Sequence, residues 1–247
     1  MEEGAIRFES VTKTFDGHAV LDDVTFRVPE GSAFCLLGRS GVGKSVTLKL
    51  LIGLLQPDEG DIVVRGRRVP SLSPSDLSAL RQRMGFLFQQ SALFDSISLG
   101  ENVAFPIRRS GKLEEAEIRE RAERGLEQVG LGGQYRKMPA ELSGGMRKRA
   151  GLARALALDP EVLLVDEPSA GLDPITSAEI DELLLKLKSV GGTTMVIVTH
   201  NIPSARRIGD RLALLENGRI HAEGTVSDLE RSEDEMVRHF MSADTGG

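Results

Sequence analysis

The sequence predicts an α/β fold in which buried strands alternate with helices. Three short apolar runs are the main signal, at residues 32–37, 162–165 and 194–198. A short, continuous apolar run between turn residues is typical of a strand covered on both faces of a parallel sheet. The first run leads into a glycine-rich loop and then a helical segment, which is the strand, loop and helix order of an α/β unit.

Antiparallel strands are predicted toward both ends of the chain. Residues 6–8 and 24–28 alternate apolar and polar side chains, and residues 62–64 form a further short strand. Near the C-terminus, two strand-like segments flank Asn217 and Gly218, a dipeptide that favours a tight hairpin turn. We therefore expect antiparallel pairing in addition to the parallel core.

Helices are predicted after the glycine-rich loop and after residues 62–64. The segment 46–55 is expected to end only at Pro57, because proline cannot continue a helix. Ser75 is expected to cap a second helix that reaches about Met84. A C-terminal helix is expected from about residue 227.

Residues 91–157 differ in character from the rest of the chain. They show no strand pattern, and residues 113–129 and 144–158 carry charged or alanine-rich sequences with apolar residues at helical spacing. We therefore predict a helical subdomain inserted at about residues 91–157 into a single domain that spans residues 1–247.

Composition and charge argue against several classes of protein. The 247 residues are 40% hydrophobic and 28% charged, as in ordinary globular proteins, and the net charge of −6 argues against broad coating of nucleic acid. No apolar run approaches the roughly 18 residues that span a bilayer, and the acidic N-terminus is unlike a secretory signal. The single cysteine, Cys35, is expected in a buried strand and in a reducing cytoplasm.

The glycine-rich loop has the spacing G-x-x-x-x-G-K-S/T of a phosphate-binding loop. Its glycines let backbone N–H groups turn toward phosphate oxygens, and the following helix adds its positive N-terminal end. Lys44 is expected to bridge the β- and γ-phosphates of ATP, and the Ser45 hydroxyl to bind Mg²⁺. A glycine-rich turn without a ligand is the alternative. The predicted ATP-binding residues here are Gly38, Arg39, Ser40, Gly41, Val42, Gly43, Lys44, Ser45 and Val46.

Two carboxylates follow the apolar run at residues 162–165. Asp166 and Glu167 lie at the carboxyl end of that predicted strand, the edge at which α/β sheets bind their ligands. Asp166 is suited to Mg²⁺ through water, and Glu167 to accepting a proton from the attacking water. An acidic turn without function is the alternative for this pair taken alone.

Residues 142–146, with the sequence Leu-Ser-Gly-Gly-Met, predict a second anion site. Ser143 can cap the next helix, and Gly144 and Gly145 leave its free N–H groups accessible. One active site needs only one phosphate cradle. Two copies of the chain that face each other would use both, each cradle closing on the other copy's nucleotide. A simple helix start is the alternative.

Together these motifs resemble the ATPase subunits of ABC transporters over nearly the whole chain. The resemblance implies a P-loop NTPase fold with a RecA-like core, an antiparallel β subdomain and an inserted α-helical subdomain. Residues 142–146 are similar to the LSGGQ signature, with Met146 in place of glutamine. The resemblance further implies that Gln89 is the Q-loop glutamine, which senses Mg²⁺ and water, and that Asp173 belongs to the D-loop at the dimer seam.

Two further residues take their roles from the same resemblance. His200 matches the switch histidine on the γ-phosphate, with a turn histidine as the alternative. Phe15 stands in the place of the aromatic residue that stacks on adenine, with a core residue at a strand end as the alternative. The implied catalytic residues are Glu167, His200, Gln89 and Lys44, and the implied metal-binding residues are Ser45, Gln89 and Asp166.

The resemblance also implies a mechanism and partners. ATP closes a head-to-tail pair of chains, in which Ser143 and Gly145 of one copy complete the site of the other, and Glu167 orients water for in-line attack. Integral-membrane permease subunits carry the cargo, and no nucleic acid is expected as a partner. The expected location is peripheral, on the cytoplasmic face of a bacterial inner membrane.

Longer segments are similar to the Mla/Mkl-type ATPases, which energise phospholipid transport with MCE proteins. The similar segments are residues 88–96, 101–106, 142–155 and 173–176, with Val46 after the phosphate loop. The implied function is ATP hydrolysis that energises phospholipid transport, with an MCE-type lipid-binding protein in the complex. Import of amino acids or another small solute is the alternative.

The basic cluster of Arg147, Lys148 and Arg149 has two interpretations. It could bind nucleic acid or anionic lipid, but residues after a helix start often face solvent, and we expect a solvated face. A DNA-repair ATPase would need a long coiled-coil insert, and a translation-type ABC protein would need two sets of motifs; the sequence has neither. A non-catalytic binding module would lack Lys44 or the acidic pair.

Overall fold

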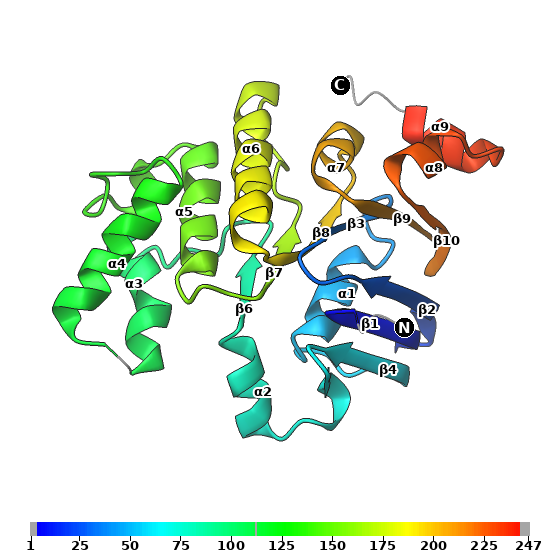
Figure 1. Ribbon diagram of the computed structural model, residues 1–247, viewed down its shortest axis with the longest axis horizontal. Coiled ribbons are helices and arrows are strands. Elements are labelled where there is room, and N and C mark those ends of the chain that lie inside the picture. Colours follow the sequence, from blue (N-terminus) through cyan, green and yellow to red (C-terminus); the bar gives the residue numbers. More distant parts are fainter. Residues whose placement is uncertain (1–3, 112, 243–247) are drawn as a thin grey trace. The chain divides into compact units, whose positions relative to one another are not determined.

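The computed structural model describes residues 4–111 and 113–242 (Figure 1). The described chain forms two compact units. The first contains the residues up to Ala79 together with those from Leu187 onward, and the second contains residues 80–186. Helices α2 (Pro74–Arg81) and α6 (Pro174–Gly191) each contain one of the two points at which the chain passes between the units.

The first unit contains an antiparallel sheet with the strand order β2-β1-β4-β5. Phe8 is paired with Phe26 on one side and with Ile62 on the other, and all three side chains are buried. The rings of Phe8 and Phe26 stack with their centroids 4.6 Å apart, a cross-strand pair that stabilises this sheet. The strands are β1 (Ile6–Phe15), β2 (His18–Val28), β4 (Glu59–Val64) and β5 (Arg67–Arg68), and the 3-10 helix η1 (Val69–Ser71) follows.

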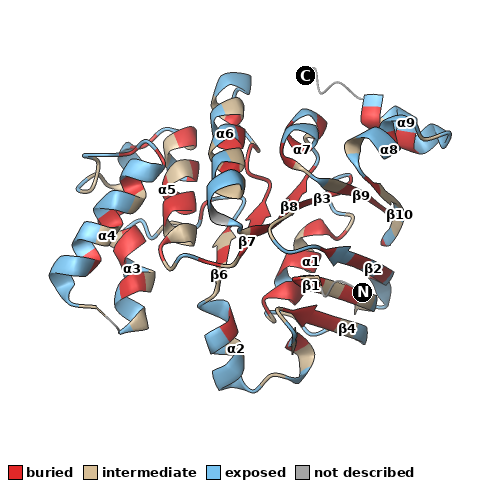
Figure 2. Ribbon diagram, in the orientation of Figure 1, coloured by how far each residue is buried: buried red, intermediate tan, exposed pale blue. Residues whose placement is uncertain are grey.

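Parallel strands carry the glycine-rich loop of the first unit. Strand β3 (Ala33–Leu37) lies between β8 (Thr194–Thr199) and β9 (Arg211–Glu216) and runs parallel to both. All residues of β3 and β8 are buried, and both strands are red in Figure 2. Cys35 is one of them. The predicted pair of buried parallel strands in this part of the chain is confirmed.

The predicted hairpin near the C-terminus is also confirmed. Strand β9 pairs antiparallel with β10 (Arg219–Gly224), and the turn residues Asn217 and Gly218 have φ values of 49° and 78°. Two successive positive φ values give the turn whose twist suits a tight hairpin. The helices of this part are α7 (Ile202–Ile208), α8 (Val226–Glu230) and α9 (Glu235–Ser242).

The boundaries of two helices differ from the prediction. Helix α1 (Lys44–Leu51) ends well before Pro57, because Gly53 takes a left-handed φ of 63° and the Leu54 N–H returns to the carbonyl of Lys49. Helix α2 is capped by Ser73 rather than Ser75, since the Asp76 N–H donates to the Ser73 hydroxyl at 3.2 Å and proline opens the helix. It ends at Arg81, before the expected Met84.

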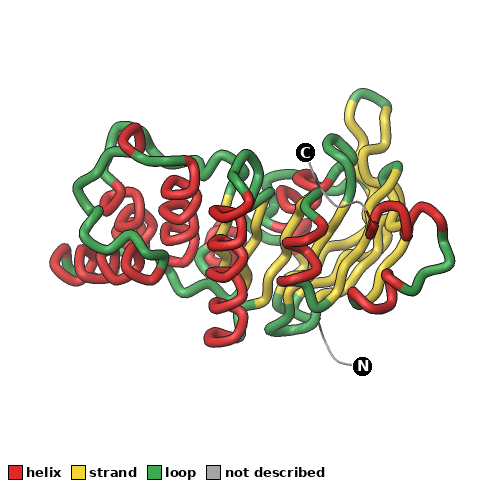
Figure 3. Tube along the Cα trace, turned by 90° about the horizontal axis from the view of Figure 1, so that it is seen from above, coloured by secondary structure: helices red, strands yellow, loops and turns green. Residues whose placement is uncertain are grey.

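The second unit combines two parallel strands with a group of helices. Strand β6 (Met84–Leu87) pairs in parallel with β7 (Val162–Asp166). Figure 3 shows helices but no strand in the described residues between 91 and 157. The helices between 91 and 157 are α3 (Leu99–Ser110), α4 (Glu115–Gln128), the 3-10 helix η2 (Pro139–Glu141) and α5 (Gly144–Leu156).

Nowhere in the described chain is a helix both long and apolar enough to cross a membrane.

Candidate functional site

The loop between β3 and α1 has the backbone of a phosphate cradle. Gly38, Gly41 and Gly43 have φ values of 157°, 85° and 107°, a region that residues with a side chain rarely adopt. A Cβ atom at Gly38 would lie 2.5 Å from the carbonyl oxygen of Leu215, and one at Gly43 would lie 2.8 Å from that of Val20. These two positions need glycine for space as well as for conformation.

Lys44 begins α1 and lies across this loop. Its ammonium donates hydrogen bonds to the carbonyl oxygens of Gly38 and Arg39, at 2.7 and 3.1 Å, and the residue is only 6% exposed. The first turn of α1 contains no acidic side chain, so nothing in that turn neutralises the positive end of the helix. The cradle, the ammonium and the helix end together suit an anionic group such as a phosphate.

The other predicted loop residues surround this cradle. Arg39 and Ser40 are exposed, as is Gly41, whereas Val42 is half-buried. Ser45 and Val46 are half-buried in the first turn of α1. The hydroxyl predicted to bind Mg²⁺ is thus adjacent in the chain to the ammonium predicted to bind phosphate.

His200 leaves the sheet of the first unit at the same edge as the glycine-rich loop. Strands β3 and β8 are parallel neighbours with Leu37 paired to Thr199, so the loop and His200 each follow the carboxyl end of one of two adjacent strands. Ligands of α/β sheets bind at this edge. Asn201 then caps α7 by accepting a hydrogen bond from the Ser204 N–H at 3.0 Å, which fixes the chain just beyond the histidine.

Phe15 ends β1 in the first unit. Its ring is 39% exposed and lies 5.4 Å from the ammonium of Lys13, a cation–π distance. This exposure excludes the alternative that Phe15 is a core residue. Stacking on adenine stays a prediction.

In the second unit, the residues predicted to hold Mg²⁺ and water share one sheet edge. Leu87 of β6 is paired with Val165 of β7, so Gln89 and the acidic pair follow adjacent parallel strands. Asp166 and Glu167 are 8% and 7% exposed. Glu167 has a φ of 47°, a left-handed conformation that is uncommon in residues with a side chain and concentrates at functional sites.

Lys148 of α5 is buried beside this edge, so the prediction of a solvated face was wrong for this residue. It is 5% exposed, and its ammonium donates hydrogen bonds to the backbone carbonyl oxygens of Gln89 and Glu167, the latter at 2.8 Å. Burial lowers the pKa of Lys148 to about 8, although the Asp166 and Glu167 carboxylates act in the opposite direction. The side chain is therefore largely charged at neutral pH.

The burial of Lys148 follows from the face of α5 on which it lies. Lys148, Gly151 and Arg154 are three residues apart and so share one side of the helix. A Cβ atom at Gly151 would lie 3.0 Å from the Cβ of Ser91, and Arg154 donates to the carbonyl oxygens of Ser91 and Ala92 at 2.9 and 2.7 Å. This face therefore packs on the chain that follows β6, and the spacing around Gly151 was the sequence signal for it.

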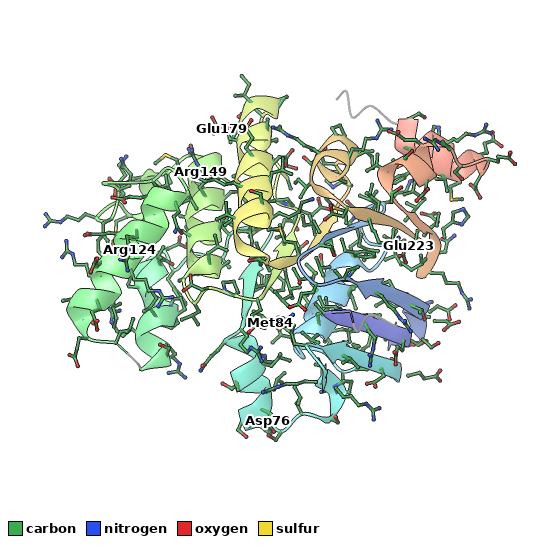
Figure 4. The ribbon with its side chains drawn as sticks, viewed as in Figure 1. Asp76, Met84, Arg124, Arg149, Glu179 and Glu223 are labelled. Carbon is green, nitrogen blue, oxygen red and sulfur yellow. The ribbon has the colours of Figure 1, made fainter. Side chains whose placement is uncertain are left out.

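The other two residues of the basic cluster are partly open to solvent. Arg147 is exposed and donates to the carbonyl oxygen of Leu142 at 2.7 Å. Arg149 lies 3.7 Å from the carboxylate of Glu179 on α6, and both residues are labelled in Figure 4. The solvated-face prediction is thus correct for the exposed Arg147 and partly correct for Arg149.

The segment 142–146 forms the start of α5. Ser143 is exposed and is the N-cap of the helix, accepting a hydrogen bond from the Met146 N–H at 3.2 Å. Gly144 is half-buried, whereas Gly145 is buried, and a Cβ atom at Gly145 would lie 2.3 Å from the methyl carbon of Thr176. The first turn contains no acidic side chain, so this helix start also suits an anion.

Asp173 lies just before α6, where Thr176 connects it to the start of α5. The Asp173 carboxylate accepts hydrogen bonds from the Thr176 hydroxyl at 2.6 Å and from the N–H groups of Thr176 and Ile175 at 3.0 and 3.1 Å. The two hydrogen bonds from Thr176 lower the pKa of Asp173 and keep it ionised. Thr176, which contacts both Asp173 and Gly145, is a site residue that the sequence analysis missed.

The predicted site residues thus fall into two groups, one in each unit. In the first unit, the phosphate loop and His200 meet at one sheet edge, and Phe15 ends a strand of the other sheet. The second unit holds Gln89, Ser143, Gly144, Gly145, Asp166, Glu167 and Asp173.

Comparison with known proteins identifies the family. The sequence profile of the ABC transporter family matches residues 21–170, more than half of the chain. This chain therefore belongs to the ABC transporter family, as one of its ATP-binding ATPase subunits.

Curated relatives match almost the whole chain. The "Probable ribonucleotide transport ATP-binding protein mkl" of Mycobacterium leprae is 44% identical over 238 residues, which cover 96% of this chain and 69% of that protein. The "Intermembrane phospholipid transport system ATP-binding protein MlaF" of Escherichia coli is 37% identical over 98% of this chain and 90% of that protein. MlaF of Haemophilus influenzae is 38% identical over 100% and 94%. The resemblance to Mla/Mkl-type ATPases is confirmed.

Solved structures confirm the predicted fold class. The ATP-binding cassette MJ0796, solved as a dimer in a post-hydrolysis state with ADP and phosphate, has a TM-score of 0.83 and 33% identity over 89% of this chain and 98% of its own. The protein cbiO1 of Clostridium perfringens, part of an ABC transporter complex, also has a TM-score of 0.83, with 28% identity over 96% of this chain and 99% of its own.

Proposed function

We propose that this ATPase works as a head-to-tail pair with Mg²⁺ and energises the transport of phospholipid through a membrane permease. One observation carries the cargo assignment. The relatives whose names state phospholipid transport are matched over 90% and 94% of their length, whereas the relative whose name states ribonucleotide transport is matched over 69%. Because the match to MlaF covers nearly the full length of this chain and of MlaF, it favours phospholipid as the cargo.

The first unit supplies phosphate binding in this proposal. Backbone N–H groups of the loop and the Lys44 ammonium hold the phosphates, and His200, at the same sheet edge, contacts the γ-phosphate. Phe15, with its exposed ring at the end of β1, stacks on the adenine.

The donor groups of the chain fit Mg²⁺. The Ser45 hydroxyl, the Asp166 carboxylate and the Gln89 amide all offer oxygen, the donor atom that Mg²⁺ prefers. Among the described residues there is no cluster of three or more His, Cys, Asp or Glu side chains arranged to hold an ion. Proteins hold Mg²⁺ through one or two groups together with substrate phosphates. When bound, the ion neutralises charge on the β- and γ-phosphates.

Glu167 is the proposed general base. Its side chain is buried at the end of β7 and its backbone is held in a left-handed conformation, so its carboxylate position is constrained. A constrained carboxylate can orient a water molecule for in-line attack and accept its proton. In the paired state, the helix start at Ser143 and Gly145 of the second copy completes the phosphate site, because its free N–H groups attract anions.

The base assignment is tested by replacing Glu167 with glutamine in the full chain. Glu167→Gln keeps the size of the side chain and removes its ability to accept a proton, so steady-state hydrolysis of ATP should be lost. The variant should still bind ATP. Because it does not hydrolyse the ATP, ATP-dependent dimers should accumulate and be detected by size-exclusion chromatography. Near-normal hydrolysis by the variant would show that Glu167 is not the base.

An exposed aromatic pair in the second unit is where we place the permease contact. Phe94 and Phe105 are 45% and 43% exposed with ring centroids 5.0 Å apart, and Arg154 lies 5.8 Å above the Phe94 ring. Arg154 also holds the carbonyl groups of Ser91 and Ala92, just after Gln89, so the pair is continuous with the Q-loop segment. Exposed aromatic groups of this kind are enriched at protein interfaces.

The remaining partners and the location follow from the cargo. A phospholipid transporter of this type includes an MCE-type lipid-binding protein, and the ATPase is peripheral, on the cytoplasmic face of the bacterial inner membrane. Co-purification of the chain with its membrane partner, followed by mass spectrometry of the bound small molecules, tests this. Recovery of phospholipid supports the proposal. Recovery of ribonucleotide or amino acid with no lipid would refute the cargo while leaving the ATPase assignment intact.

A further inference from the structure

A buried ammonium group joins two parts of the second unit that carry candidate catalytic residues. Lys148 extends from α5 and donates to the backbone carbonyl of Gln89, beyond β6, and to that of Glu167, beyond β7. A lysine ammonium has three donors and no acceptor, so two of its donors match these two carbonyl oxygens. At 5% exposure, little water is available to replace these hydrogen bonds.

The two carbonyl groups belong to residues whose orientation matters for hydrolysis. The peptide group that follows Glu167 is oriented by its ψ angle, and the residue already occupies a left-handed φ of 47°. A hydrogen bond to the Glu167 carbonyl therefore restricts the backbone from which the carboxylate projects. The hydrogen bond to the Gln89 carbonyl ties the chain after β6 to the chain after β7, because the same ammonium also binds the Glu167 carbonyl.

A second lysine in the chain performs a similar bridging task away from the candidate site. Lys188 donates to the carbonyl oxygen of Ile208 at 2.9 Å and to the Asp210 carboxylate at 2.8 Å. Lys188 holds the segment between α7 and β9, where none of the proposed catalytic residues lies. It therefore serves as a matched control for the loss of a bridging ammonium.

We propose that Lys148 is a positioning residue for hydrolysis, which holds the Gln89 and Glu167 backbones in the arrangement that aligns the attacking water. The role rests on the proposed function of Gln89 and Glu167. The hydrogen bonds of Lys148 in the structure go to the backbone carbonyls of Gln89 and Glu167, not to a residue of the phosphate loop. Its loss should therefore lower kcat while leaving the KM for ATP nearly unchanged.

The test compares Lys148→Met, Lys148→Arg and Lys188→Met in the full chain. Methionine has a similar volume to lysine but is one atom shorter and donates no hydrogen bond. A misplaced catalytic group can lower turnover by roughly 100-fold. We expect a loss of that order in kcat for Lys148→Met, with binding of a fluorescent ATP analogue retained. Lys148→Arg keeps both charge and donors and should restore most of the turnover. Lys188→Met should lower the unfolding temperature but not kcat.

Four results would overturn the proposal. These are an unchanged kcat in Lys148→Met, a rise in KM alone, an equal fall of kcat in Lys188→Met, or no rescue by arginine. If Lys148→Met does not accumulate as folded protein, Lys148→Ala, where water can reach the two carbonyls, is measured in the same way. Glu167→Gln is assayed in parallel. Normal turnover in Glu167→Gln refutes the proposed base, whereas its inactivity beside a fully active Lys148→Met refutes only the positioning role.

Discussion

The phosphate loop of the first unit offers mainly backbone groups, whereas the acidic pair of the second unit consists of buried side chains. Gly38 and Gly43 have no space for a Cβ atom, so the phosphate loop presents peptide groups. Asp166 and Glu167 instead depend on a neighbouring helix, whose Lys148 holds the chain around them. The contrast implies a division of labour. Changes in the loop should act mainly on ATP affinity, and changes in the second unit mainly on turnover.

The largest effect, on ATP affinity, is expected from Gly38→Ala. The added Cβ meets the Leu215 carbonyl oxygen at 2.5 Å, so the loop must change the conformation proposed to bind phosphate. A strain of about 3 kcal/mol corresponds to a loss of roughly 100-fold in ATP affinity, which titration calorimetry would detect.

Gly66→Ala is the matched control for this substitution. Gly66 has a φ of 75° but no atom within 4 Å of its Cβ position, and it lies outside the loop. It should lose some stability to backbone strain while binding ATP normally. Unaltered ATP affinity in Gly38→Ala would show that the loop does not bind the phosphates.

An intermediate effect is expected from Gly145→Ala in the second unit. The new Cβ would lie 2.3 Å from the methyl carbon of Thr176, a short side chain with little freedom to move. Turnover should fall by about tenfold with little change in ATP affinity, since an interaction between contacting residues is worth about 0.5–3 kcal/mol. Thr176→Ser removes the methyl and keeps the hydroxyl that donates to Asp173. The double variant should therefore turn over faster than Gly145→Ala, and equal rates would contradict this account.

The smallest effect is expected from Arg149→Gln. Arg149 lies next to Lys148 in the same turn, but its ion pair with Glu179 is 3.7 Å long and partly exposed. The free energy of unfolding should change by less than about 1 kcal/mol, as measured by urea denaturation. A large fall in turnover would show that the charge of this helix matters as a whole, rather than the contact that Lys148 makes.

The same contrast explains which features could be predicted from the sequence. The phosphate loop and the Asn217-Gly218 turn are encoded in adjacent residues, and their backbone conformations follow from glycine and asparagine chemistry. Lys148 could not be placed by its basic neighbours, because its burial depends on the packing of α5 against the chain after β6. The end of α1 was wrong for a different reason, because the prediction relied on Pro57 and overlooked the local stop signal of Gly53.

The close approach of Gly145 to Thr176 also limits the order in which this sequence can change over evolutionary time. We expect alanine at position 145 to cost about tenfold in turnover while position 176 keeps its methyl group, and Thr176→Ser to be acceptable in either background. The two positions are therefore expected to be epistatic, and a path that begins with Thr176→Ser avoids the less active intermediate.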